Sequence, residues 1–322
     1  MNIVFCVDPS VLPGLHVAAY SLLERMHPAA DQTRFTIFSE TLDDSDMALL
    51  QQTLGVLTKR FKLELRRVDG SGFAKFPPLN DSWATYYRLF AARICESERL
   101  LYLDADTLCD VDVSELNSLD MRDTPVAWVP EAPLSRAVDR NVAEYLGNSE
   151  AESYFNAGVM LMNVAEWRRQ KISERAMEYI AAHRPAFHDQ SALNFVLHRN
   201  AVALDEKYNC MSNMRKNWPA VQRPYGSIGR LVHFLDYPKP WDFLGEWVHP
   251  QYRLWHSVLN QTAMRHFQSW RPTASRRLPK TRKAWIGYKK ALKDRILFAG
   301  YRHGWLRRVK GVPIISPAES VL

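Results

Sequence analysis

In the first third of the chain, segments with two different apolar patterns follow one another in turn. Short, nearly continuous apolar runs predict buried strands, and segments with apolar residues every three or four positions predict helices. The expected strands cover residues 2–7, 33–39, 62–68 and 100–103, and the expected helices cover residues 15–27, 44–53 and 85–95. This order predicts an α/β fold in which a mostly parallel sheet carries helices on both faces.

The rest of the chain has a less regular pattern. The stretch FNAGVMLMN, residues 155–163, predicts a further strand, residues 164–184 predict one long helix, and residues 189–199 predict another. Prolines and aromatic residues farther along predict loops. We therefore expect one domain over residues 1–270 and a segment of different character over residues 271–322.

Composition narrows the class of protein. The chain has 322 residues, of which 47% are hydrophobic, which is enough for a large core. Its four cysteines are scattered, without zinc or disulfide spacing, and we expect reduced thiols in a cytosolic protein. No stretch reaches the roughly 18 to 20 apolar residues that cross a bilayer, and the start MNIVFCV is expected to be a strand rather than a signal peptide.

Positive charge is concentrated in the C-terminal segment. Fourteen Lys and Arg residues lie between Arg271 and Lys310 with Asp294 as the only acid, although the whole chain carries only +7. Apolar residues recur at helical intervals among these charges: Trp285, Tyr288, Leu292 and Ile296. Such a basic amphipathic helix is typical of segments that lie on anionic membrane surfaces. Packing of its apolar side on the domain, or dimerisation, are the alternatives; no nucleic acid is expected as a partner, because no recognition motif accompanies the charge.

Two carboxylates follow directly on the apolar run LLYL, in the stretch LLYLDADTL. Asp104 and Asp106 stand one residue apart at the end of a predicted buried strand. On an extended backbone such residues point the same way, so both are expected to converge on one cation just beyond the strand. Ligands of parallel sheets bind at this edge, and paired carboxylates suit Mg²⁺ or Mn²⁺. The alternative is that Asp104 caps the following turn and Asp106 is solvated.

Longer motifs give this pair a context. In chain order they are NIVFCVD at 2–8, TYYRLFAARICESERLLYLDADTLC at 85–109, YFNAGVMLMNVAEWR at 154–168, HDQSALNFVL at 188–197 and, as a partial match, HFLDYPKPW at 233–241. With these stretches the chain resembles the glycosyltransferase family eight enzymes, which are retaining sugar-nucleotide transferases of the GT-A fold. Within that family it is most similar to the bacterial lipopolysaccharide galactosyl- and glucosyltransferases.

The resemblance implies a metal site. Asp104 and Asp106 match the family's metal-binding carboxylates, and His233 matches its third ligand. An imidazole beside two carboxylates favours Mn²⁺, with Mg²⁺ as the other possibility. The metal would bind the diphosphate and stabilise the departing nucleoside diphosphate.

The resemblance also implies which residues bind a UDP-sugar donor. Asp8 and Ser10 match nucleotide contacts, Asp8 at the uracil base, whereas Lys239 matches a diphosphate contact. The other matched donor-binding positions are Arg88, Ala105, Asn156 and Asp189. Without the family, Asp8 reads as a turn residue, Lys239 as a solvated loop lysine and Arg88 as a helix-surface arginine.

Two positions are the candidates for catalysis. Gln190 matches the residue nearest the anomeric carbon on the face opposite the leaving group, and Asp189 is its neighbour. A neutral amide is a poor nucleophile, so front-face attack by the acceptor hydroxyl is favoured. A transient covalent intermediate on Asp189 stays open at this point.

One departure affects the phosphate site. The family usually has glycine three residues after the metal histidine, where this chain has Asp236.

The resemblance implies a cytoplasmic enzyme, peripheral on the inner face of the cell membrane, that moves galactose or glucose to a hydroxyl of a lipopolysaccharide, capsule or other glycan or lipid-linked acceptor. The alternative is a nucleotide-sugar-binding protein whose activity is lost or hydrolytic.

Overall fold

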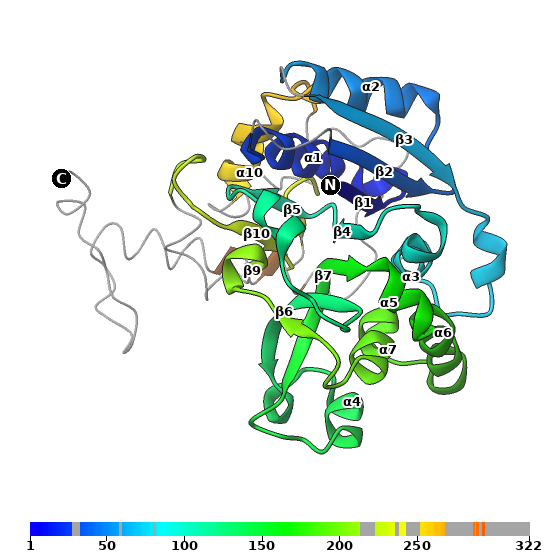
Figure 1. Ribbon diagram of the computed structural model, residues 1–322. Coiled ribbons are helices and arrows are strands. Elements are labelled where there is room, and N and C mark those ends of the chain that lie inside the picture. Colours follow the sequence, from blue (N-terminus) through cyan, green and yellow to red (C-terminus); the bar gives the residue numbers. More distant parts are fainter. Residues whose placement is uncertain are drawn as a thin grey trace, which may run out of the picture.

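The fold is described here from a computed structural model of the chain (Figure 1). The structure describes residues 1–27, 33–57, 60–79, 82–212, 223–235, 238–242 and 252–267, together with residues 286, 288, 289, 292 and 293. Within these residues, no helix has both the length and the apolar character that a membrane crossing requires.

A seven-stranded sheet forms the centre of the fold, in the order β3-β2-β1-β4-β7-β6-β8. Its strands are β1 (Asn2–Cys6), β2 (Thr33–Ser39), β3 (Phe61–Arg67), β4 (Arg99–Leu103), β6 (Val126–Pro133), β7 (Ser153–Asn163) and β8 (Val202–Ala203). The pairs β3–β2, β2–β1, β1–β4 and β6–β8 are parallel, whereas β7 runs antiparallel to both β4 and β6. The predicted mostly parallel sheet is therefore confirmed.

Helices cover both faces of this sheet (Figure 1). They are α1 (Leu12–Arg25), α2 (Asp44–Gly55), α3 (Ala84–Ile94), α4 (Arg140–Tyr145), α5 (Val164–Arg169), α6 (Ile172–His183), α7 (His188–Val196) and α10 (Tyr252–Leu259). Short 3₁₀ turns are η1 (Pro9–Val11), η2 (Gly70–Phe73), η3 (Ser114–Ser118), η4 (Leu134–Arg136) and η5 (Glu206–Tyr208). A smaller sheet, β5 (Thr107–Cys109), β10 (Leu231–Phe234) and β9 (Cys210–Ser212), lies beyond the end of β4.

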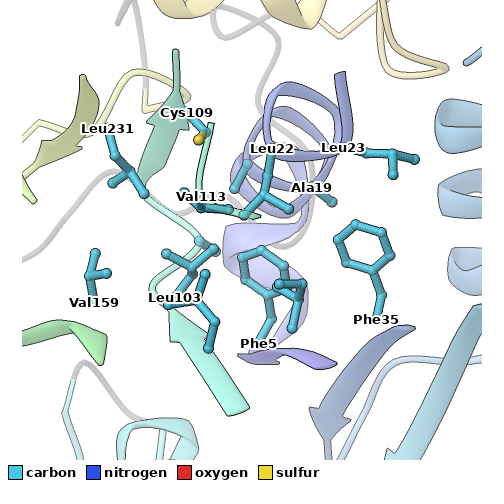
Figure 2. Packing of buried hydrophobic residues seen from close by; sticks show 14 of the residues in the cluster. Phe5, Ala19, Leu22, Leu23, Phe35, Leu103, Cys109, Val113, Val159 and Leu231 are labelled. Carbon is cyan, nitrogen blue, oxygen red and sulfur yellow. The ribbon is translucent and has the colours of Figure 1, made fainter. Parts of the chain in front are cut away.

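Strand residues alternate between two apolar cores, one on each face of the sheet. In β4, Leu101 and Leu103 join the core under α1 and α2, while Leu100 and Tyr102 join the core under α3, α6 and α7. Figure 2 shows the first core, where Phe5 and Leu103 pack beside Leu22 and Leu23 of α1. This two-sided burial explains why the strands read as continuous apolar runs.

One predicted element is wrong. The single helix expected over residues 164–184 is two helices, α5 and α6, separated at Lys171. Lys171 has a left-handed backbone with φ of 54°, so the helical path is interrupted there. The Asn163 side chain caps α5 by accepting from the backbone N–H of Glu166. Apolar spacing cannot detect this break, because both helices bury residues against the same core.

Most of the predicted amphipathic segment, including Trp285 and Ile296, lies outside the described residues. At the described positions Ile286 and Leu292 are exposed, at 53% and 59%. Tyr288 is partly buried, and burial followed by the nearby charge of Asp242 raises its pKa. Tyr288 therefore lies close to the loop after β10, whereas Ile286 and Leu292 leave apolar surface in contact with solvent.

Candidate functional site

The Asp104–Asp106 stretch forms a turn between β4 and β5 rather than an extended strand. The Thr107 hydroxyl closes the turn by donating to the Asp104 carbonyl at 2.9 Å, and the Asp104 N–H donates to the Gly158 carbonyl of β7 at 2.8 Å. The expected extended geometry is therefore wrong. The two carboxylates nevertheless lie close together, because the turn brings them to the same point beyond the sheet.

His233 reaches this point from a distant part of the sequence. Strand β10 pairs antiparallel with β5 and places His233 opposite Thr107, next to the turn. The His233 Nε2 atom lies 3.1 Å from Asp106 Oδ1 and 3.7 Å from Asp104 Oδ2. One potential ligand atom from each of the three residues lies within 4.8 Å of the others.

The surroundings of these three residues fit a divalent cation. The His233 Nδ1 atom is 3.0 Å from the Asn209 side-chain oxygen, which leaves Nε2 facing the carboxylates. A Cβ atom on Gly158 would lie 2.1 Å from His233 Cε1 and 2.8 Å from Asp104 Oδ2, so only glycine leaves room for them. Two carboxylates and one imidazole are a donor set suited to Mn²⁺.

Lys239 contacts the Asp106 carboxylate oxygen that His233 does not contact. Its ammonium donates to Asp106 Oδ2 at 2.6 Å and to the carbonyls of Phe234 and Leu235 at 2.6 and 3.2 Å. Burial alone would raise the pKa of Asp106, but Lys239 and then His233 outweigh it and hold that pKa well below its usual range. Lys239 is thus an ion-pair partner inside the site and not a solvated loop lysine.

Arg88 joins the Asp104 carboxylate to the Asp189 carboxylate. From α3 its guanidinium lies 3.0 Å from Asp104 Oδ1 and 3.0 Å from Asp189 Oδ2, and it donates to the Ala157 carbonyl at 2.7 Å. The Arg88 side chain is only 9% exposed, so it is not a helix-surface arginine. Burial raises the pKa of Asp189, although Arg88 and the Thr85 hydroxyl that donates to it act in the opposite direction.

Asn156 and Gln190 lie side by side between β7 and the start of α7. The Gln190 side-chain oxygen accepts from the backbone N–H of Ala157 at 3.0 Å and from Asn156 Nδ2 at 3.3 Å. Its Nε2 donates to the Tyr154 hydroxyl at 3.5 Å. The Gln190 amide is therefore held in one orientation, with its oxygen already in use as an acceptor.

The other predicted donor contacts line the same edge of the sheet. Asp8 follows β1, which pairs with β4, and its Oδ1 accepts from the N–H and hydroxyl of Ser10 at 2.8 and 2.5 Å. Asp8 thus caps a turn, as its sequence context alone suggested. The buried Ala105 packs its carbonyl against Gly14 of α1. Asp236 lies outside the described residues.

Several residues that support this site were not found from the sequence. The Tyr102 hydroxyl donates to Asp104 Oδ1 at 2.5 Å, and Arg88 stacks on the Tyr102 ring at 4.4 Å. Tyr102 had a readable signal, because it stands in β4 two positions before Asp104. Asn209 had none, because its contacts come from β7 and β10.

Comparison with known proteins gives the family. The model of glycosyl transferase family 8 matches residues 2–245. A lipopolysaccharide 1,2-glucosyltransferase of Escherichia coli is 30% identical over 74% of this chain and 73% of its own length. A lipopolysaccharide 1,3-galactosyltransferase of Salmonella typhimurium is 28% identical over 79% of this chain and 76% of its own length.

Comparison with solved structures identifies the fold. One similar structure is the crystal structure of the galactosyltransferase LgtC in complex with donor and acceptor sugar analogues. The match covers 89% of this chain and 100% of the LgtC chain, with a TM-score of 0.66 and 22% sequence identity. The expected GT-A architecture, a mostly parallel sheet flanked by helices, is thereby confirmed. The chain is a glycosyltransferase that belongs to glycosyl transferase family 8.

Proposed function

We propose that this chain is a retaining hexosyltransferase that takes galactose or glucose from a UDP-sugar with the help of Mn²⁺. The acceptor is a hydroxyl of a lipopolysaccharide, which is the molecule in the names of the two relatives, or of a related glycan or lipid-linked molecule. The observation that carries the proposal is the convergence of Asp104, Asp106 and His233 beside Arg88, Asp189 and Gln190.

The metal would be held by Asp104, Asp106 and His233, with Mg²⁺ as a possible substitute for Mn²⁺. When bound it supplies Lewis-acid stabilisation of the negative charge on the leaving diphosphate. Lys239 would add a second positive charge to the same leaving group. Asp8, Ser10 and Ala105 would bind the nucleotide part of the donor.

Arg88, Asn156 and Asp189 would orient the donor sugar. Arg88 already holds both Asp104 and Asp189, so it sets the distance between the metal carboxylates and the sugar-binding carboxylate. Asn156 is oriented by the N–H of Gly158, which donates to its side-chain oxygen at 3.0 Å. A sugar would therefore enter a set of polar groups whose directions are fixed beforehand.

The surroundings of the two candidate nucleophiles favour front-face attack. Asp189 is paired with Arg88 and accepts from Thr85, and the Gln190 oxygen accepts two N–H groups, which lowers the nucleophilicity of both. In the favoured reaction the acceptor oxygen bonds to the anomeric carbon on the face from which the diphosphate oxygen departs. The hydroxyl proton passes to a phosphate oxygen, and the sugar keeps its configuration.

A thermal-shift panel of nucleotide sugars with and without Mn²⁺ tests the proposal. A ligand at 100 times its Kd should stabilise the protein by about 2.7 kcal/mol. We expect a metal-dependent shift with UDP-galactose or UDP-glucose that is lost in Asp106→Asn and kept in Asn2→Ala, a variant at the opposite end of β1. Absence of a shift with every nucleotide refutes the proposal.

A transfer assay separates the enzyme from its alternatives. Incubation with the donor that shifts the protein and with lipopolysaccharide truncated at successive sugars should give a product with an α-linkage. Release of free hexose alone would indicate a hydrolase, and donor binding without turnover would indicate a binding protein.

For localisation, we propose a cytoplasmic enzyme held on the anionic inner face of the membrane by its basic C-terminal segment. The exposed Ile286 and Leu292 support this assignment. The full chain should sediment with anionic vesicles and not with neutral ones, and Ile286→Glu with Leu292→Glu should release it. Sedimentation unchanged by both substitutions contradicts the anchoring role.

A further inference from the structure

We propose that Asn209 is a positioning residue that fixes the tautomer of the metal-binding histidine and joins the metal site to the donor-sugar site. The inference rests on the proposed function, since it assigns His233 to a metal and Gln190 to the sugar. Asn209 follows η5 at the start of the small sheet and is 1% exposed.

Both ends of the Asn209 amide have a partner in the site. Its Oδ1 lies 3.0 Å from His233 Nδ1, and its Nδ2 donates to Asn156 Oδ1 at 2.9 Å. Asn156 Nδ2 in turn faces the Gln190 oxygen at 3.3 Å. Four side chains, from the strands β10 and β7, the residue after η5 and the helix α7, thus form one hydrogen-bonded chain from His233 to Gln190.

Two backbone N–H groups set the direction of every bond in this chain. The N–H of Ala157 donates to the Gln190 oxygen, and the N–H of Gly158 donates to the Asn156 oxygen. A backbone N–H cannot accept, so each of these amides must present its oxygen there. Asn209 must then present Nδ2 to Asn156 and its oxygen to His233.

The consequence for His233 is a defined tautomer. Because Asn209 offers an acceptor, the proton of neutral His233 sits on Nδ1, and the Nε2 lone pair points at Asp104 and Asp106. Metal ligation by Nε2 needs that tautomer. Loss of such an orienting partner typically lowers metal affinity by about 10- to 100-fold.

Two substitutions at Asn209 separate its two roles. In Asn209→Ala both contacts are lost, so we expect Mn²⁺ affinity to fall by about 10- to 100-fold and the preference for UDP-hexose over UDP to disappear. In Asn209→Asp an oxygen still accepts from His233, but no N–H remains for Asn156. This variant should keep Mn²⁺ affinity within a few-fold of wild type and lose the UDP-hexose preference.

Asn2→Ala is the matched control. Asn2 is also a buried asparagine, 5% exposed, with hydrogen bonds to the side chains of Ser97 and Thr36 at the far end of the sheet. It should lose stability without any change in either affinity. Circular dichroism and urea unfolding establish that the variants compared are folded.

The measurements are Mn²⁺ binding to the free protein by electron paramagnetic resonance and calorimetric binding of UDP and UDP-hexose at saturating Mn²⁺. Equal effects of the two Asn209 substitutions on Mn²⁺ affinity, or none from either, would overturn the inference. If wild type itself binds no Mn²⁺, the proposed function fails and the inference fails with it. Wild-type binding with an unaffected Asn209→Ala variant overturns the inference alone.

Discussion

Replacing Gly158 by alanine tests whether the room left by this glycine is what allows the proposed metal site to form. Gly158 lies in β7, directly behind His233 and Asp104. A Cβ there would stand 2.1 Å from His233 Cε1, where ordinary contacts begin at 3.4 Å. The imidazole or the strand must therefore retreat by more than about 1 Å, since buried side chains do not interpenetrate.

His233 has little freedom to make that movement. It is 2% exposed, tied to Asn209 on one side and paired with β5 through its backbone. Overpacking of this kind costs about 1–3 kcal/mol of stability. A displacement of about 1 Å at a catalytic group can lower the rate by about 10²-fold, which corresponds to about 2.7 kcal/mol at the transition state.

We therefore expect Gly158→Ala to bind Mn²⁺ at least 10-fold more weakly and to lose about 10²-fold in kcat/KM. Gly55→Ala is the control, because no atom lies within 4 Å of a Cβ at the end of α2. Calorimetry with Mn²⁺ and a transfer assay at saturating metal measure the two effects. Wild-type Mn²⁺ affinity and turnover in Gly158→Ala would refute the steric reasoning.

Three further predictions concern charge and burial. Lys239→Met removes the ammonium that would compete with Mn²⁺ for Asp106. Calorimetry should show Mn²⁺ alone binding a few-fold tighter and UDP binding about 10- to 100-fold more weakly. Weaker binding of both ligands would contradict this competition. Burial lowers the pKa of His16 from 6.5 to about 4. The stability that the neutral, buried imidazole contributes is therefore fully present above pH 6.5, and it is lost at lower pH because the unfolded chain binds the proton first. Urea unfolding should show a loss of about 2 kcal/mol from pH 7 to pH 5, and this loss should be absent in His16→Gln. Asp139→Ala leaves the Ser191 hydroxyl without its acceptor and should cost about 1–3 kcal/mol in urea unfolding; a loss below about 0.5 kcal/mol would show that the contact contributes little.

The sheet is predictable from the sequence because burial on both faces leaves continuous apolar runs. Residues 100–103 show this, since alternate side chains enter different cores and all four bury mainly apolar surface. The direction of β7 is not predictable in the same way. Its residues read equally well as a parallel or an antiparallel strand, and its place between β4 and β6 depends on pairing with residues distant along the chain.

The candidate site, like the sheet, was only partly predictable from the sequence. The carboxylate pair is visible in the sequence because Asp104 and Asp106 interrupt an apolar strand end. The reason they converge was not visible, because it lies in a turn closed by Thr107 and in the arrival of β10. Asn209 is the extreme case, since its side-chain partners Asn156 and His233 lie in strands of two different sheets and no local pattern in the sequence marks it.

The balance of charges in the site indicates the order in which a metal and a diphosphate would bind. The three buried or half-buried carboxylates Asp104, Asp106 and Asp189 are matched inside the site by two cations, Arg88 and Lys239. Burying unmatched charge is costly, so this pairing allows the side chains to hold their positions before any ligand arrives. Among these described groups one negative charge is in excess, and a divalent cation would change that excess to one positive charge. Such a site binds a diphosphate better after the metal than before it. We therefore expect UDP affinity measured by calorimetry to rise with Mn²⁺ concentration, and UDP binding that is independent of Mn²⁺ would show that this balance does not control the site.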